Sequence, residues 1–340
     1  MKKYNIFYIG ADPQTLNILV SARNFNVLSV NYLWFFSKQS LNPFNLFFKY
    51  LYFKRLKKEE INKLDLLIWS IVRHFLTSVF SKYSEYFDTI LTHDIRIIDV
   101  DKTDDCLQHI IKSGVDLNVV NVWPILSDTL IFAPKYKTIN IHPSKLPKYR
   151  GSLPTLWALK NEDSSSAVTY IVLEKKMDSG SIINQHQFNI EKKDNWLNLE
   201  NKILDILKQT LVKDILSYLN GDIHIRMQDF SASSFTGKYE TYKRILFSEE
   251  KAKDIYNKTN LYPYLEDGVF CFFVFRNRKI YVKKIELSDL ILDLKIGHFQ
   301  ISGLKIFFMT NQGALTATLF KDIAFKDSLL LFLCNPDRIQ

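Results

Sequence analysis

The sequence predicts an α/β fold: a doubly wound parallel sheet domain with a helical insertion, followed by a smaller β-rich C-terminal domain. Three observations indicate this. The chain opens with an apolar strand, a glycine turn and an amphipathic helix, which is how doubly wound domains begin. Strand and helix patterns alternate again over residues 95–221. Beyond about residue 245, short alternating runs separated by glycines and polar turns are typical of β structure.

The first elements follow from their apolar spacing. Residues 4–10 form an apolar run that ends at Gly10, and the residues through Leu16 and Val20 then have helical spacing. A second apolar run, residues 26–36, is the next expected strand. These elements build the amino-terminal part of a parallel sheet.

A glycine-free segment, residues 41–90, interrupts the alternation. Residues 41–63 carry six Lys or Arg against two Glu, among many aromatic residues. We expect a helical insertion over about 35–90, either a cap packed on the sheet or a basic, aromatic surface for a membrane or a partner.

The alternation of strands and helices resumes after the insertion. In chain order we expect strand 95–100, helix 103–114, strands 116–123, 137–141, 166–174 and 181–190, and helix 195–219. Asp194 is expected to cap the last helix and Gly221 to end it. With 340 residues the chain is long enough for two domains, which we place at 1–220 and 246–340 with a connector at 221–245.

Composition narrows the class of protein. The net charge of +9 allows nucleic acid as a partner, but it suits an enzyme with anionic substrates equally well. Cys106, Cys271 and Cys334 are scattered, which argues for a reducing, cytoplasmic compartment and against a zinc site. We find no signal peptide and no apolar run long enough to span a membrane.

The stretch 139–151, INIHPSKLPKYRG, contains the strongest candidate site. Asn140 and His142 stand two apart at the end of a strand, so their side chains leave on the same side. Ligands of open parallel sheets bind beyond the carboxyl ends of the strands. An amide donor and an acid or base active near neutral pH therefore meet where a ligand is expected, with the forked cation of Arg150 nearby.

A carboxylate is the expected third member. Asp178 lies in the sequence MDSG, 177–180, in a turn between two expected strands. It could orient His142 and raise its basicity by accepting the ring N–H. The sequence contains no Walker loop, GxGxxG, HExxH or GxSxG pattern, so nucleotide hydrolysis, dinucleotide redox chemistry and serine chemistry lack support.

These motifs resemble one known family. The matching residues are Asn140 to Gly151, Val168-Thr169 and Asp178-Ser179-Gly180. The chain resembles the 10-formyltetrahydrofolate-dependent formyltransferases, which include glycinamide ribonucleotide, methionyl-tRNA and amino-sugar-nucleotide enzymes. It is most like the sugar-nucleotide N-formyltransferases. The resemblance implies a Rossmann-like catalytic domain over 1–220 and an OB-like fold for the C-terminal domain.

The resemblance also implies roles for particular residues. Asn140 would hold the formyl oxygen as negative charge develops on it, His142 would polarise the formyl group and relay a proton, and Asp178 would help to deprotonate the incoming amine. Residues implied to bind the folate co-substrate are Trp123, Pro124, Leu126, Ile131, Glu174 and Lys175. Residues implied to bind the acceptor substrate are Gly10, Ala11, Ser144 and Arg150. No metal is expected.

The sequence departs from the family at three places. Ile171 and Leu173 stand where members often have His and Met, and neither position carries the transfer chemistry. The Gly/Arg/Lys-rich loop of the tRNA enzymes is replaced by the glycine-free insertion. This replacement makes tRNA a less suitable acceptor.

We therefore expect the acceptor to be the primary amine of a dTDP- or UDP-linked 4-amino sugar, for cell-surface polysaccharide synthesis. Alternatives are methionyl-tRNA, another small amine, or an inactive homologue that acts as a binding module. The expected partners are the sugar nucleotide and the folate donor, 10-formyltetrahydrofolate, rather than nucleic acid. The resemblance also allows a homodimer.

Overall fold

The computed structural model describes most of the chain outside the predicted insertion. The described residues are 3–10, 12–22, 28–34, 95–98, 103–121, 126–236, 244–261, 271–275, 278–288, 294–302 and 305–319. The predicted insertion at about 35–90 lies outside them, as do Ala11, Trp123 and Pro124. Within the described residues, no helix is long and apolar enough to cross a membrane.

The described chain divides into two compact units. The first unit comprises residues 1–151, 166–188 and 202–234, and the second comprises 152–165, 189–201 and 235–340. The proposed domain limits differ from this division, because α7 (Pro154–Lys160) and the start of α8 (Trp196–Asn220) group with the second unit. The limits 1–220 and 246–340 stay a proposal.

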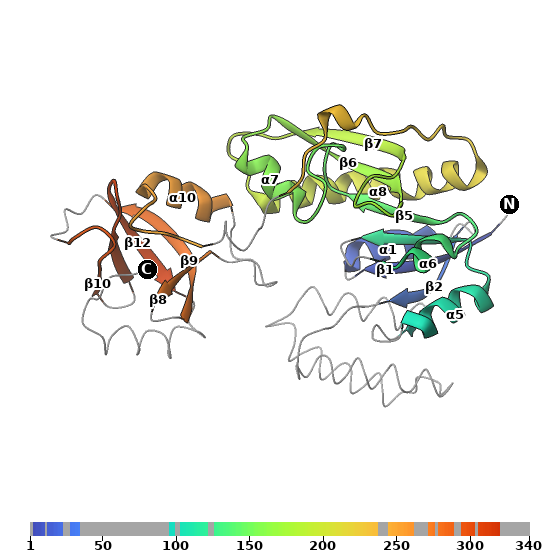
Figure 1. Cartoon of the computed structure of the whole chain (residues 1–340), viewed down its shortest axis with the longest axis horizontal. Helices are drawn as coiled ribbons and strands as arrows, with labels where there is room; N and C mark the ends of the chain where they lie inside the picture. Colours follow the sequence, from blue (N-terminus) through green and yellow to red (C-terminus); the bar gives the residue numbers. More distant parts are fainter. Residues whose placement is uncertain are drawn as a thin grey trace. The chain divides into compact units, whose positions relative to one another are not determined.

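The first unit is built on a seven-stranded sheet (Figure 1). Its strands are β1 (Tyr4–Gly10), β2 (Leu28–Trp34), β3 (Arg96–Ile98), β4 (Leu117–Asn121), β5 (Thr138–His142), β6 (Ser165–Val172) and β7 (Ile182–Asn189). Its helices are α1 (Pro13–Ser21), α5 (Thr103–Ser113), α6 (Asp128–Phe132) and most of α8. The predicted strands and helices thus recur in the predicted order, with ends that differ by a few residues.

The strand order is β3-β2-β1-β4-β5-β6-β7. Pairing is parallel from β3 through β5, and the order reverses between β1 and β4, as in a Rossmann-like fold. The prediction of a purely parallel sheet is wrong at its far side, because β6 pairs antiparallel with β5. A parallel β6 would require the chain to cross back over the sheet first. Antiparallel strands at the edge of such sheets are common.

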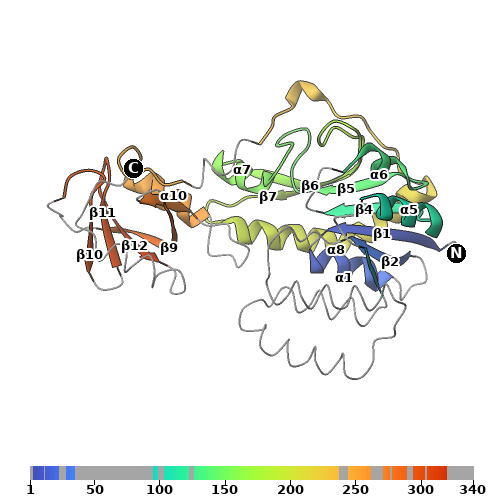
Figure 2. The same ribbon diagram turned by 60° about the horizontal axis from the view of Figure 1, so that its bottom comes forward.

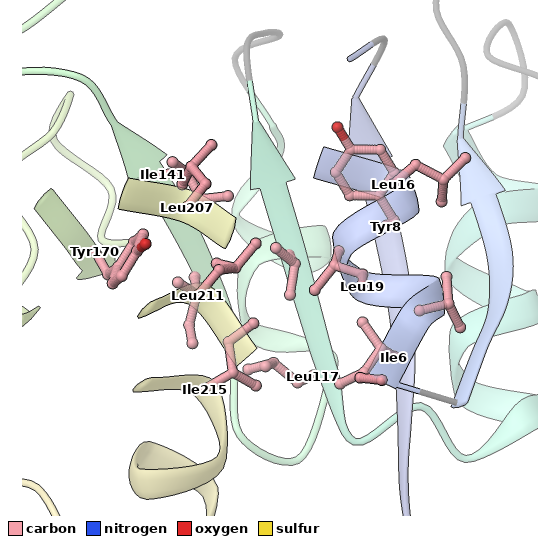
Figure 3. Packing of buried hydrophobic residues seen from close by; sticks show 14 of the residues in the cluster. Ile6, Tyr8, Leu16, Leu19, Leu117, Ile141, Tyr170, Leu207, Leu211 and Ile215 are labelled. Carbon is pink, nitrogen blue, oxygen red and sulfur yellow. The ribbon is translucent and has the colours of Figure 1, made fainter. Parts of the chain in front are cut away.

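Helices cover both faces of this sheet (Figure 2). One buried cluster joins alternate residues of β1, β4, β5 and β6 to α1 and α8, with Ile6, Tyr8, Leu117 and Leu211 all fully buried or nearly so (Figure 3). A second cluster joins the opposite face to α5 and α6. Two buried faces explain why β1 is apolar almost throughout and why every residue of β4 is buried, its two asparagines included.

The helix ends largely follow the predicted signals. Helix α5 ends at Ser113, and Gly114 follows with φ +59°. Gly221 follows α8 with φ +80°. The predicted cap of α8 is wrong by one position: Asn195 accepts a hydrogen bond from the Asn198 backbone N–H at 3.0 Å. Asp194 instead accepts one from the Glu191 N–H, so its carboxylate closes the preceding turn.

The second unit contains a five-stranded antiparallel sheet, which confirms a β-rich C-terminal part. Its strands are β8 (Phe272–Phe275), β9 (Arg278–Ser288), β10 (Phe299–Ser302), β11 (Lys305–Met309) and β12 (Ala314–Leu319), ordered β10-β11-β12-β9-β8. Helix α10 (Ala252–Leu261) packs on it, around buried Phe247, Phe273 and Phe308. The OB-like topology stays a prediction.

Candidate active site

Strand β5 carries two polar side chains to its carboxyl end. Ile139 and Ile141 join the core under α1 and α8, so the alternating Asn140 and His142 face the other side of the sheet. His142 is buried, with 4% of its surface exposed, whereas Asn140 is half-buried. Strand β5 lies next to β4, beside the point where the strand order reverses. Ligands of this fold class bind at that edge.

The ring of His142 is held by a backbone carbonyl. Its Nε2 lies 2.9 Å from the carbonyl oxygen of Tyr149. A carbonyl oxygen only accepts hydrogen bonds, so Nε2 carries the hydrogen and donates it. In the neutral ring, Nδ1 then bears the lone pair, and Nδ1 lies 3.8 Å from Asp178 Oδ2. The expectation that Asp178 accepts the ring N–H is therefore wrong for this geometry. Asp178 is placed to pair with a proton that arrives on Nδ1.

The carboxylate of Asp178 lies close to three groups of the site, which are the His142 ring, the Asn140 amide and the Gly151 N–H. Its Oδ1 accepts a hydrogen bond from Asn140 Nδ2 at 3.3 Å, and its Oδ2 accepts one from the Gly151 N–H at 2.8 Å. Asp178 itself lies in the turn between β6 and β7, as the sequence predicts, and has φ +46°. The structure thus brings together the predicted set of Asn140, His142 and Asp178.

The turn is pressed against the end of β6. A side chain at Gly180 would overlap the carbonyl oxygen of Val172, so only glycine fits there. Asp178 has a positive φ, which is uncommon for a non-glycine residue but is adopted by aspartate more readily than by most. Lys137, Tyr149, Leu153 and Glu162 also have positive φ.

The loop that follows β5 is fixed by its own hydrogen bonds. Ser144 is fully buried, and its hydroxyl donates to the carbonyl of Lys148 at 2.7 Å. Arg150 is 8% exposed and donates from both Nε and Nη2 to the carbonyl of Met177. The side chains of Ser144 and Arg150 therefore bind the protein itself, and their predicted role in binding the acceptor stays a prediction.

Gly10, which is predicted to bind the acceptor, lies at the same edge of the sheet. Gly10 ends β1, where a Cβ would lie 2.5 Å from the carbonyl oxygen of Asn121. The structure therefore requires glycine at this position. Whether its backbone N–H meets the acceptor stays a prediction.

Four residues predicted to bind the folate are described. Leu126 and Ile131 belong to the buried cluster beneath α6. Glu174 is exposed and pairs with Lys137 at 3.3 Å. Lys175 is exposed and pairs with Asp128 at 2.9 Å. Their role in binding the donor stays a prediction.

Sequence reasoning missed one residue that contacts the site. Gln228 is 7% exposed, and its Nε2 donates to the carbonyls of Asp178 and Gly180 at 2.8 and 2.7 Å. No local pattern marks it, since it lies in the irregular segment that follows α8. Its burial beside exposed residues such as Met227 is visible only in the structure.

The Rossmann-like sheet thus has an amide, an imidazole and a carboxylate close together at the carboxyl end of β5. Residues 99–215 match the sequence model of the family described as formyl transferase. This match supports the formyltransferase family that the resemblance predicted. The described residues contain no group of three or more side chains that could hold a metal ion.

Curated relatives share part of the sequence. The chain is 30% identical to the methionyl-tRNA formyltransferase of Thermotoga neapolitana over 146 residues, which are 43% of this chain and 47% of that protein. It is 30% identical to the methionyl-tRNA formyltransferase of Hydrogenobaculum sp. over 194 residues, 56% of this chain and 62% of that protein. The matches thus span about half to three fifths of the relatives' length.

Solved structures share the fold over nearly the whole chain. WlaRD, a sugar 3N-formyl transferase crystallised with dTDP and 5-N-formyl-tetrahydrofolate, superposes with a TM-score of 0.54 at 15% identity, covering 94% of this chain and 99% of WlaRD. An N-formyltransferase from Helicobacter canadensis, in complex with folinic acid and dTDP-3-aminofucose, gives 0.54 at 14% identity, covering 93% and 100%.

Proposed function

We propose that this protein transfers a formyl group from 10-formyltetrahydrofolate to the primary amine of an amino-sugar nucleotide. One observation carries the proposal: Asn140, His142 and Asp178 converge at the carboxyl end of β5. The match of residues 99–215 to the formyl transferase family supports the reaction class.

The chemistry of these side chains suits formyl transfer. The donor supplies an activated formyl group when it is bound. Asn140 offers an amide N–H to an oxygen on which negative charge develops, and such donors stabilise transition states strongly. An amine must be neutral to attack, so a base has to remove a proton. The Nδ1 of His142 is the free base of the neutral ring, and Asp178 at 3.8 Å stabilises the proton once it arrives there.

The same edge of the sheet suits the folate donor in our proposal. Leu126 and Ile131, with Trp123 and Pro124, form the apolar segment after β4 that would hold the pterin. Backbone groups near Glu174 and Lys175 would face it from the start of the turn after β6. The Asn140 amide can donate to the formyl oxygen, and His142 and Asp178 can accept the proton that the attacking amine loses.

The choice of acceptor rests on the share of this chain that each group of similar proteins matches. Two solved sugar N-formyltransferases match 93–94% of this chain, β-rich part included, whereas the curated tRNA enzymes match 43–56% of it. This favours a dTDP- or UDP-linked amino sugar. The sequence predicted a 4-amino sugar, whereas WlaRD is a sugar 3N-formyl transferase and the Helicobacter canadensis enzyme is in complex with dTDP-3-aminofucose, so the proposal covers both positions. A cytoplasmic site, a role in cell-surface polysaccharide synthesis and a homodimer remain predictions.

Methionyl-tRNA is the second candidate acceptor, favoured by the curated relatives and by the net charge of +9. The two are separated by incubating the protein with 10-formyltetrahydrofolate and either 3- and 4-amino-sugar nucleotides or charged initiator tRNA. We expect a formylated sugar nucleotide by mass spectrometry. tRNA binding should be weak and lost with salt, because contacts to many phosphates release counterions. Efficient formylation of the tRNA and no activity on any sugar nucleotide would refute the proposed acceptor.

A further inference from the structure

The turn that carries Asp178 is anchored from outside itself. Three backbone carbonyls of the turn accept hydrogen bonds from side chains, namely those of Met177, Asp178 and Gly180. The donors are Arg150, which precedes the turn by 27 residues, and Gln228, which follows Asp178 by 50. Both donors are more than nine-tenths buried. Two separate parts of the chain therefore hold one short turn.

The amide of Gln228 is oriented by the turn. Its Nε2 lies 2.8 Å from the Asp178 carbonyl and 2.7 Å from the Gly180 carbonyl. Both partners only accept, so the nitrogen rather than the oxygen must face them. Among the described residues, the buried Oε1 of Gln228 has no hydrogen-bond partner. A buried, unpartnered acceptor costs stability. Gln228 therefore serves the turn at some cost to the fold.

The geometry of Asp178 depends on this anchoring. Asp178 has φ +46°, which is uncommon for a non-glycine residue, although aspartate adopts this region more readily than most. Its two carboxylate oxygens face different donors, Asn140 Nδ2 and the Gly151 N–H. A relaxed backbone would rotate the carboxylate away from at least one of them.

Arg150 completes the anchor on the other side of Asp178. Its Nε and Nη2 both reach the Met177 carbonyl, and its guanidinium lies 5.3 Å from the centre of the Phe230 ring. Phe230 belongs to the same segment as Gln228, only two residues further along the chain. The segment 228–230 and Arg150 thus bracket the turn together.

We infer that Gln228, together with Arg150, is a positioning residue that fixes the backbone of the 177–180 turn, so that the Asp178 carboxylate faces Asn140, Gly151 and His142. This rests on the proposed function, in which Asp178 serves formyl transfer. Gln228 does not touch the reacting groups and acts through the backbone of the turn.

Two readouts on Gln228→Met test the inference. Methionine has nearly the same shape but no N–H to donate, and it removes the unpartnered acceptor. We expect the unfolding midpoint to fall only slightly, because loss of the unpartnered acceptor offsets part of the two hydrogen bonds that the turn loses. Amide hydrogen exchange at Gly151 should become about tenfold faster, because its bond to the carboxylate is charge-assisted. The kcat for formyl transfer should fall by about 10²-fold with KM little changed, since misplacing a group by 1 Å can cost that much.

Asn118→Leu is the matched control. Asn118 is fully buried, its Nδ2 also donates to two acceptors, Leu130 O and Thr138 Oγ1, and its Oδ1 is likewise without a partner among the described residues. It lies at the amino end of β4, away from the turn. This variant should leave Gly151 exchange unchanged. Should Gln228→Met fail to fold, Gln228→Asn, which keeps the amide on a shorter side chain, gives the same two readouts.

The outcomes separate the two proposals. Wild-type protein that transfers no formyl group refutes the proposed function, while Gly151 exchange still decides whether Gln228 holds Asp178. Unchanged Gly151 exchange in Gln228→Met overturns the inference, and so does a kcat equal to that of the wild type. A loss of kcat that only parallels a lower unfolding midpoint also overturns it, since Gln228 would then be merely structural.

Discussion

Asp178→Asn is the substitution whose effect the structure defines most closely. The side chain keeps its shape but loses its charge and one of its two acceptors. In the wild type, Oδ1 accepts from Asn140 and Oδ2 accepts from Gly151. An asparagine can accept at only one of these positions. Its oxygen can keep the Gly151 N–H, but its NH₂ group then faces Asn140, which has to turn its amide oxygen toward it and so no longer presents the same N–H to the site.

The expected magnitude follows from the distance to His142. Two unit charges 3.8 Å apart attract by about 4 kcal/mol at an effective dielectric constant of about 20. Both side chains are largely buried, at 5% and 12% exposure, so solvent screens this attraction only partly. Each 1.36 kcal/mol changes a rate about tenfold. If the protonated His142 forms in the transition state, kcat should fall by about 10²–10³-fold, the upper figure using the whole attraction.

The assay is the initial rate of formyl transfer from 10-formyltetrahydrofolate to the best amino-sugar nucleotide, compared with the unfolding midpoint of the same sample. Asp214→Asn is the matched control. Asp214 is buried, lies 2.6 Å from His186 Nε2 and accepts from Asn184 at 3.2 Å, but it packs on the α8 side of the sheet. It should lose stability without losing kcat. A kcat within threefold of the wild type for Asp178→Asn would refute the role given to the carboxylate.

Three further outcomes are expected. Asn140→Ala and His142→Ala should each lower kcat by about 10²-fold or more. The kcat of the double variant should fall little further, because the effects of residues that act as a unit are not additive. Full additivity of the two effects would contradict a shared role. Lys258→Ala should destabilise the second unit by about 3 kcal/mol or more, because Glu250 loses its partner at 2.8 Å in a largely buried ion pair. Denaturant unfolding measures this, and a change within experimental error would contradict it. Burial raises the pKa of Tyr170. The stability that its neutral hydroxyl contributes is therefore fully present below the ordinary tyrosine pKa of about 10 and is lost as pH rises toward the folded-state pKa. Tyr170→Phe should remove this alkaline loss of stability, and a pH profile of stability identical to that of the wild type would count against it.

Local patterns were enough to predict much of the fold. The apolar run that became β1 is buried on nearly every residue, so its composition is distinctive. The site motif was also local, since a strand end places Asn140 and His142 on one side whatever surrounds them. The turn at Asp178 was marked by Gly180, which only glycine can occupy.

What the sequence did not predict depends on contacts between distant residues. The antiparallel pairing of β6 with β5 is decided by the path of the chain, which the strand's own residues do not encode. Asp194 and Asn195 are both good capping residues, and only the backbone geometry selects Asn195. No local pattern predicts that His186 pairs with Asp214, which lies 28 residues away on α8.

The same limit applied inside the site. The Tyr149 carbonyl, rather than Asp178, holds the His142 ring, and a main-chain group carries no sequence signal. Gln228 reaches the turn from 50 residues away. The residue types that carry the chemistry were therefore predictable, whereas the groups that orient them required the three-dimensional structure.

The central claim is that Asn140, His142 and Asp178 carry formyl transfer to an amine. It is tested most directly by a single turnover, with enzyme in excess over labelled 10-formyltetrahydrofolate and the amino-sugar nucleotide in saturating amount. The account predicts one N-formyl product for each tetrahydrofolate released by the wild type, and no product above the uncatalysed rate from the folded Asn140→Ala/His142→Ala/Asp178→Ala variant. Transfer by that variant at a rate near that of the wild type would contradict the account.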